Sequence, residues 1–421
     1  MHCDTINIKN GINLHIIDTD KFKTNLISVF LTKKLTRENV TKEALIPAVL
    51  RLGTNKIKTQ KELSKKLEEM YGADFNCGIE KRGDNHVLKF YIEAMEDEFA
   101  LEKENILEQS INFLLDVVFD PLIDGGSFNK DYVNGEKDNL KKIIEAKIDN
   151  KRNYAYLRCI EEMYKNENYG IYEYGYIEDL NDINEKNLYE YYKKFLNECK
   201  IDIFISGRIQ KYNIPEMIES NSNILKLEER QPDYIQNSIQ NAKKRDAKRI
   251  EESMDVTQGK LTIGMKIENS KNEEAVLNVY NGILGGDANS KLFQNVREKA
   301  SLAYTAGSAY LKAKNNIFIR CGIEIKNYEE TVEIIIKQLE DMKNGNFSEK
   351  DISNSKELIL ASLNSIPDEQ ANEISYYLSQ ELYDNKISIE EFENRIRAVS
   401  KAQIIDVAKR VYVDTIYFLK N

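Results

Sequence analysis

The same order of predicted elements occurs twice along the chain, and this repetition constrains the fold more than any other feature. The first copy opens with strand-like segments at 13–17 and 25–31, and the second opens with a strand at 260–267. Each copy closes with a helix followed by an apolar strand, from Tyr191 to Ser206 and from Ile404 to Leu419. A repeat of about 200 residues predicts two homologous α+β halves, each with a β-sheet covered by long helices.

A polar, charged stretch separates the two copies. From Ser222 to Ser253 the sequence is rich in Lys, Arg, Glu, Gln and Asn and has few apolar anchors. Such a composition is typical of a solvated connector. We therefore expect an N-terminal half over residues 1–221, a linker over 222–256 and a C-terminal half over 257–421.

The periodicity of apolar residues predicts the elements within each half. Strands are expected at 13–17, 25–31, 73–79, 86–94 and 201–206, and then at 260–267, 303–310, 316–325 and 415–419. Helices are expected from Val40, at 59–70, 102–119, 129–150, 151–164 and 187–196, and then at 273–284, 328–342, 349–363, 368–383 and 402–411.

The charge balance excludes two classes of partner. The 421 residues include 60 Lys and Arg against 70 Asp and Glu, which gives a net charge of -10. A field of this sign repels nucleic acid phosphates and anionic lipids, so neither is expected as a main partner. The first residues lack the pattern of a signal peptide and no run approaches a membrane span, so we expect a cytoplasmic protein.

Cysteine and histidine usage limits the chemistry further. The five cysteines are scattered and form no Cys-x-x-Cys pair, which favours reduced, mostly buried thiols. His2, His15 and His86 are the three histidines of the sequence, and their spacing does not fit a histidine-based zinc site. His15 and His86 lie in predicted strands, where packed structural roles are expected.

One string in the second half carries a specific resemblance. It runs Leu284-Gly285-Gly286-Asp287-Ala288-Asn289-Ser290-Lys291-Leu292-Phe293, continues with Val296-Arg297-Glu298-Lys299 and ends with Leu302-Ala303-Tyr304. It resembles the insulinase/pitrilysin zinc peptidases, the inverzincins. The resemblance implies a pitrilysin-like fold with a clam-like arrangement of the halves, and a substrate-binding and oxyanion-stabilising role for Arg297 and Tyr304. The alternative is that Arg297 forms an ion pair near Glu298 and that Tyr304 packs on the sheet.

The two glycines of this string have another possible reading. Gly285-Gly286 could form a phosphate-binding loop, but no Gly-Lys-Ser/Thr follows and no dinucleotide spacing is present. We expect these glycines to end the helix that begins near Glu273 and to permit close packing.

In the first half, one segment corresponds to the family's zinc-binding motif but has no side chains that can bind a metal. Active members carry His-x-x-Glu-His on a helix that runs into Gly-Thr, and the corresponding segment here spans Ala44 to Thr54. The resemblance places the two histidine positions at Ala44 and Ala48 and the general-base position at Pro47. A helix containing Glu136 and Glu145 resembles the one that supplies the third ligand, with Ile143 at the ligand position. No metal is therefore expected in this chain.

Further strings extend the resemblance over most of the chain, among them Leu67-Glu68-x-x-Tyr71-Gly72-Ala73 and Asp120-Pro121. The likeness is greatest to the zinc-free bacterial members of YmfF type. It implies a non-catalytic subunit of a heterodimeric peptidase, in which a zinc-bearing sister subunit hydrolyses a peptide held in a central cavity. The alternative is a pseudoenzyme scaffold or peptide-binding module without proteolysis. A metallopeptidase that acts alone is not expected.

Overall fold

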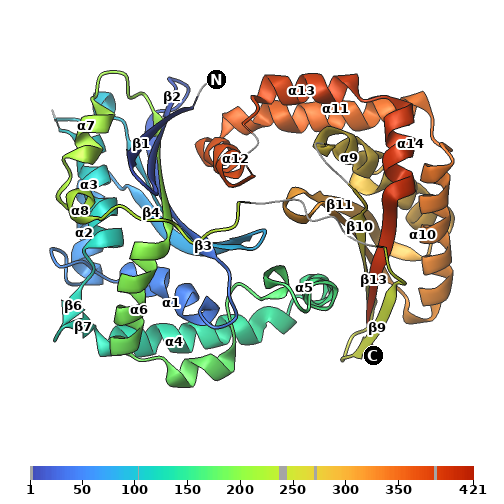
Figure 1. The fold of residues 1–421 in the computed structure, drawn as a ribbon, viewed down its shortest axis with the longest axis horizontal. Helices are drawn as coiled ribbons and strands as arrows, with labels where there is room; N and C mark the ends of the chain where they lie inside the picture. Colours follow the sequence, from blue (N-terminus) through green and yellow to red (C-terminus); the bar gives the residue numbers. More distant parts are fainter. Residues whose placement is uncertain (1–2, 103, 237–243, 270–272, 384–385) are drawn as a thin grey trace. The chain divides into compact units, whose positions relative to one another are not determined.

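The computed structural model describes residues 3–102, 104–236, 244–269, 273–383 and 386–421, and it divides the chain into two compact units (Figure 1). Unit 1 comprises residues 1–145, 171–236 and 369–382, and unit 2 comprises 146–170, 237–368 and 383–421. Each unit thus contains one segment from the opposite half of the sequence. Within the described residues, no helix is long and apolar enough to cross a membrane.

Unit 1 is built on a six-stranded mixed sheet with the order β1-β2-β8-β3-β5-β4. Its strands are β1 (Asp4–Lys9), β2 (Ile12–Asp18), β3 (Thr24–Lys34), β4 (Asp74–Arg82), β5 (Asn85–Met95) and β8 (Lys200–Gly207), with a separate hairpin of β6 (Ile123–Asp124) and β7 (Ser127–Phe128). Its α-helices are α1 (Val40–Leu50), α2 (Gln60–Glu69), α3 (Ile106–Phe119), α4 (Lys130–Glu145), α6 (Glu185–Glu198), α7 (Ile214–Glu219), α8 (Ser222–Lys226) and α12 (Gln370–Tyr383).

Both faces of this sheet are apolar, so both must be covered. Val29 and Leu31 of β3 point into the core formed with α1, α3 and α6, whereas Phe30 between them points to the other face. Because side chains alternate along a strand, one run of apolar residues supplies two cores. This explains why the central strands read as continuous apolar segments.

Helix α12 covers the second face of the unit 1 sheet (Figure 1). Its buried Ile374, Leu378 and Leu382 pack against residues that include Phe30 and Phe204. The Gln370 amide donates to the Ser206 carbonyl at 2.9 Å and fixes the start of the helix on β8. A helix from the C-terminal part of the sequence therefore completes the N-terminal unit.

Unit 2 has a five-stranded sheet with the order β11-β12-β10-β13-β9. Its strands are β9 (Lys248–Ser253), β10 (Gly259–Ile267), β11 (Ala303–Leu311), β12 (Asn316–Ile323) and β13 (Val411–Lys420). Its helices are α5 (Lys151–Met163), α9 (Glu274–Asn281), the π-helical η5 (Gly282–Gly286) and η6 (Phe293–Lys299), α10 (Tyr328–Lys343), α11 (Glu349–Ser365), α13 (Ile389–Ala398) and α14 (Lys401–Arg410).

The two sheets share one topology over five strands. In unit 1 the order β2-β8-β3-β5-β4 begins with a parallel pair and continues antiparallel, and β9-β13-β10-β12-β11 does the same in unit 2. The predicted α+β class, with a sheet covered by long helices in each unit, is confirmed.

Helix α5 covers the second face of the unit 2 sheet. Its Cys159 and Met163 pack against Phe318 and Tyr417. Gly264 of β10 allows this approach, because a Cβ at that position would lie 2.6 Å from the Met163 sulfur. Helix α5 therefore approaches β10 closely at Gly264, where the strand has no side chain.

The structure contains elements that the sequence did not predict. These are strands β1 and β9, the β6–β7 hairpin and helices α7, α8 and α13, together with the short π-helical and 3-10 segments. The expected linker of 222–256 contains α8 and β9, and residues up to 236 belong to unit 1. β1 and β9 are largely exposed strands with polar side chains, so they lack the apolar run by which the other strands are recognised.

A buried polar cluster lies on the α12 face of the unit 1 sheet. His15 Nε2 lies 2.9 Å from an Asp202 carboxylate oxygen, and the Lys200 ammonium donates to the same carboxylate at 2.8 and 2.9 Å. Burial alone would raise the pKa of Asp202, but Lys200 and His15 outweigh it and lower this pKa from 3.8 to about 2. The His15 ring also stacks on Phe204 at 4.2 Å, which confirms the packed role expected for this histidine.

We expect this carboxylate to make stability depend on acid pH. Its pKa is lower in the folded chain than in the unfolded chain, so Asp202 stabilises the fold above about pH 4, and the contribution of about 2 kcal/mol is lost as the pH falls toward 2. Urea unfolding should show that the stability difference between the unsubstituted chain and Asp202→Asn shrinks over this range. A difference that stays constant from pH 5 to pH 2 contradicts the assignment, and Asp138→Asn on the exposed side of α4 is the control.

Candidate degenerate metal site

Helix α1 carries the positions that correspond to the metal motif. It is apolar around most of its circumference and buried along most of its length, as expected of a helix enclosed by neighbouring elements. Pro47 lies inside the helix, where it has no N–H to donate to the Glu43 carbonyl. The residues at the motif positions are therefore compatible with packing but offer no side-chain donor atoms.

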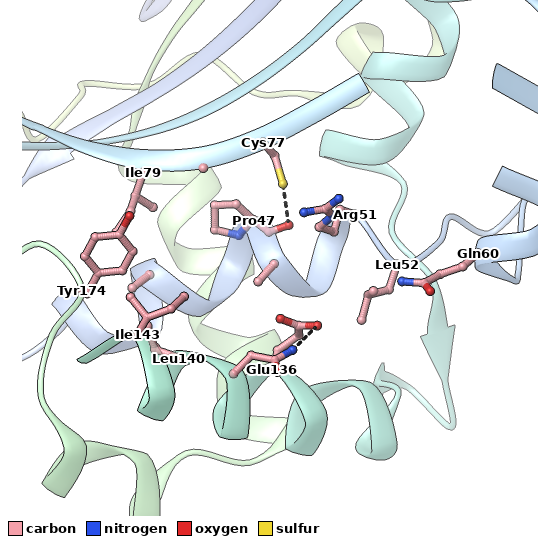
Figure 2. Close-up of a pocket in the computed structure, with 14 residues that line it drawn as sticks. Pro47, Arg51, Leu52, Gln60, Cys77, Ile79, Glu136, Leu140, Ile143 and Tyr174 are labelled. Carbon is pink, nitrogen blue, oxygen red and sulfur yellow. Dashed lines mark hydrogen bonds between the residues drawn. The ribbon is translucent and has the colours of Figure 1, made fainter. Parts of the chain in front are cut away.

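A cavity of about 340 Å³ lies against the face of α1 that carries Ala44, Pro47 and Ala48 (Figure 2). The structure brings together the residues that the resemblance placed at the ligand and base positions, namely Ala44, Pro47 and Ala48 of α1 and Ile143 of α4. The opposite wall is β4, through Cys77, Gly78 and Ile79. Glu136 and Asn139 of α4, Tyr174 and Arg51 complete most of the lining.

The donor set of the cavity does not fit a zinc ion. Zinc needs imidazole, thiolate or carboxylate donors, and catalytic sites use three protein ligands. Here α1 presents two methyl groups and a pyrrolidine ring, and α4 presents the Ile143 side chain. Among the residues with a described position, no three His, Cys, Asp or Glu side chains are arranged to hold a metal.

Cys77 does not replace the missing zinc ligands. Its thiol donates to the Pro47 carbonyl at 3.3 Å, as Figure 2 shows. Burial raises the pKa of this thiol to about 11, and Glu136 adds to the increase while Arg51 opposes it. The thiolate, which is the form that binds metals and attacks electrophiles, is therefore disfavoured at neutral pH.

Sequence reasoning missed a buried polar cluster around Glu43 of α1. The carboxylate of Glu43 accepts a hydrogen bond from the Tyr191 hydroxyl at 2.6 Å and lies 2.8 Å from His86 Nδ1. Burial, together with the Glu43 charge, raises the pKa of Tyr191. The sequence feature that could have revealed this cluster is Glu43 itself, a charged residue inside an otherwise apolar helix. The packed role expected for His86 is confirmed.

Tyr304 lies on the strand predicted at 303–310, whereas Arg297 lies on a helix that was not predicted. Arg297 is in η6, where its guanidinium lies over the Phe293 ring at 4.5 Å and its Nε is 3.7 Å from a Glu298 carboxylate oxygen. Tyr304 follows at the start of β11 and is 62% exposed. The ion-pair alternative for Arg297 therefore has a contact in the structure, whereas Tyr304 does not pack on the sheet. Neither residue belongs to the α1 cavity.

The backbone around these residues explains the exposure of Tyr304. The β11 to β12 register shifts between Ala303 and Thr305, so Tyr304 occupies a β-bulge. The expected close packing at the glycine pair is confirmed, because a Cβ on Gly285 would lie 2.5 Å from the Ser308 nitrogen. Gly285 interrupts η5 with a non-helical conformation, as expected for the end of a helix.

Together, the fold and the α1 cavity define a peptidase-like protein whose metal site has lost its ligands. The family described as Peptidase M16 inactive domain matches residues 182–359. The "Probable inactive metalloprotease YmfF" of Bacillus subtilis (strain 168) is 37% identical over 98% of this chain and 96% of its own length. The chain belongs to the M16 peptidase family, the insulinase/pitrilysin family, and to its inactive members of YmfF type.

Solved structures show the same fold. A conserved protein from Enterococcus faecalis V583 superposes with a TM-score of 0.91 at 28% identity, covering 100% of this chain and 99% of that one. A peptidase M16 inactive domain from Pseudomonas fluorescens shares the fold, with a TM-score of 0.81 at 16% identity, and covers 100% of this chain and 98% of that one.

The donor set leads to a direct test of metal binding. Purified protein should contain no stoichiometric zinc, because the motif positions supply no donor atom. Elemental analysis of the protein and its thermal midpoint before and after dialysis against a chelator provide the measurements, and the midpoint should not change. One zinc per chain, with a lower midpoint after chelation, contradicts the description of the cavity.

Proposed function

We propose that this chain is the non-catalytic subunit of a heterodimeric M16 peptidase. A zinc-bearing sister subunit would hydrolyse peptides in a central cavity, and this chain would supply Arg297 and Tyr304 to bind the substrate and stabilise the oxyanion. The residue ranges 1–221 and 257–421 are proposed to be homologous halves, a view supported by the shared order of five strands. The cytoplasm is the proposed compartment, and the five free thiols support it.

The observation that carries the proposal is the contrast between the two sites. The motif on α1 has no donors, whereas the tyrosine hydroxyl at the start of β11 is exposed and Arg297 is 43% exposed. An exposed tyrosine on a bulge is available to a substrate, since a bulge turns a side chain away from the regular sheet. A hydroxyl or guanidinium aimed at developing negative charge stabilises a transition state by about 3 to 4 kcal/mol.

Reconstitution with a zinc-bearing relative tests this proposal. The two chains should form a complex that cleaves peptides, and Arg297→Ala or Tyr304→Phe in this chain should lower kcat by about 100-fold, as expected for a lost oxyanion donor. Peptide cleavage is followed with a fluorogenic substrate.

The matched control is Arg395→Ala, because Arg395 is 44% exposed and pairs with Glu391 on its own helix. This variant should retain the full rate. If the complex forms and Arg297→Ala cleaves as fast as the unsubstituted complex, the role of Arg297 is wrong and the scaffold function is favoured.

A second candidate function is a peptide-binding module without proteolysis, which the α1 cavity supports. The cavity lies beside β4, the edge strand of the unit 1 sheet, and combines apolar walls with Arg51 and Glu136. Small residues at positions 44 and 48 leave space for a peptide side chain where active members hold zinc.

A substitution that fills the cavity tests this candidate. Ala48→Leu should weaken peptide binding to the chain alone by about tenfold, equal to about 1.4 kcal/mol, because the added side chain occupies the space. Binding is measured by fluorescence anisotropy with a library of labelled peptides. Ala402→Leu, at an exposed alanine on α14, is the control and should bind normally. Equal affinity of Ala48→Leu and the unsubstituted chain excludes the cavity as the binding site.

A further inference from the structure

Three cationic side chains gather on the α5 face of the unit 2 sheet. Lys260 of β10 and Arg320 of β12 share a face, because Lys260 pairs with Gly322 and Thr262 pairs with Arg320 in the antiparallel register. Arg152 comes from the first turn of α5, the helix that covers this face. The Arg320 guanidinium lies over the Tyr156 ring of α5 at 5.1 Å.

Without a bound anion, the three positive charges of Arg152, Lys260 and Arg320 destabilise one another. Burial lowers the pKa of both Arg320 and Lys260, and the charge of Arg152 lowers each of them further. Arg152 is also near the positive end of the α5 dipole, where cations are disfavoured. The cluster thus combines partial desolvation with repulsion between like charges.

No carboxylate offsets this repulsion within the described part of the chain. Besides Arg152, the group that acts on the pKa of Arg320 is the Tyr156 hydroxyl, and the Lys260 ammonium donates to the neutral Gln258 amide. Other cations of unit 2 are neutralised, since Arg158 binds Glu252 and Arg245 binds Asp414. Arg158 and Arg245, which also lie near this sheet, thus have carboxylate partners, whereas the groups that act on Lys260 and Arg320 are cationic or neutral.

Two neutral polar side chains, those of Gln258 and Thr305, meet over Gly322 on the same face of the sheet. Gly322 lies between Lys260 and Thr305 in the register and has no side chain to cover them. A Cβ at Gly322 would lie 2.9 Å from the Gln258 amide oxygen and 3.2 Å from the Thr305 hydroxyl, so both polar groups converge over the glycine. The exposed Tyr304 adjoins Thr305 on β11.

We propose that Arg152, Lys260 and Arg320, with Gln258 and Thr305, form a binding site for a carboxylate group of an acidic peptide. The cations supply charge-assisted donors, and the Thr305 hydroxyl and the Gln258 amide supply neutral ones. A peptide carboxylate fits because the site adjoins Tyr304, so this inference rests on the proposed peptide-binding function and adds a preference for Asp, Glu or a C-terminal carboxylate.

The preference is measured by fluorescence anisotropy with the full chain, alone and in the reconstituted complex. The probes are a labelled glutamate-rich peptide, its glutamine counterpart of the same length, and inorganic phosphate as a competitor. The glutamate peptide should bind more tightly, and Arg320→Gln or Lys260→Gln should weaken its binding by about 10- to 100-fold, as expected for lost hydrogen bonds to a charged group. The affinity for the glutamine peptide should not change with these substitutions.

Two further variants separate binding from folding. Arg249→Gln removes one positive charge from an exposed arginine of the same unit that pairs with Glu329, and it should bind the glutamate peptide normally. Arg152→Gln should weaken binding while it raises the thermal midpoint of the unliganded chain, because it relieves repulsion. A folding defect would lower the midpoint instead.

Three outcomes overturn the inference: equal affinity for the two peptides, unchanged binding of the glutamate peptide by Arg320→Gln, or competition by phosphate with no preference for glutamate. These outcomes leave the proposed subunit role intact, because that role is judged by the effect of Arg297→Ala on kcat. Conversely, a charge-dependent affinity in the chain alone supports the site even if the complex shows no peptidase activity.

Discussion

Each of the two sheets is apolar on both faces, and the need to exclude water from the second face governs the rest of the structure. Burying a large apolar side chain stabilises a fold by about 1.5 to 3 kcal/mol relative to leaving it exposed. The second face of unit 1 includes Phe30 and Phe204, and that of unit 2 includes Phe318 and Tyr417. Each face is closed by a single helix, α12 or α5, so neither half of the sequence can form its complete unit without the other.

Charged side chains on these second faces are paired with partners. On the α12 face of unit 1, Asp202 is satisfied by His15 and Lys200. On the α5 face of unit 2, Glu252 accepts from Tyr154 and Tyr417 and pairs with Arg158. These paired clusters fix the two covering helices or the strands beneath them. The cations around Arg320 contrast with them, since within the described residues they lie on such a face without an anion.

The sequence predicted the elements better than it predicted where they pack. Helices α5 and α12 were both expected close to their observed bounds, but a helical period shows only which side is apolar and not which sheet will cover it. Contiguous halves were therefore expected, whereas the compact units exchange these two segments. Strand β9 escaped prediction for a related reason, because its stability comes from pairing with β13 and not from apolar side chains.

At the candidate site, the sequence identified the positions and the structure supplied their surroundings. Ala44, Pro47, Ala48 and Ile143, the positions to which the resemblance assigned the metal motif, line one cavity in the structure. Cys77 and Tyr174 could not have been placed there, because they come from segments far away in the chain whose contacts depend on the tertiary fold. The roles of Arg297 and Tyr304 stay predictions, and the structure adds that Tyr304 is accessible at the start of β11.

Pro47 and its alanine neighbours make the loss of metal chemistry difficult to reverse. A catalytic zinc site needs three protein ligands, so a single histidine restored at position 44 or 48 would supply too few donors to bind the ion. It would also place a polar ring against the apolar wall formed by Leu140 and Ile143, without a function to compensate. Each step back toward an active site would be neutral or harmful by itself. A zinc site on α1 would therefore need several substitutions made together, at positions 44, 47, 48 and 143 of this cavity.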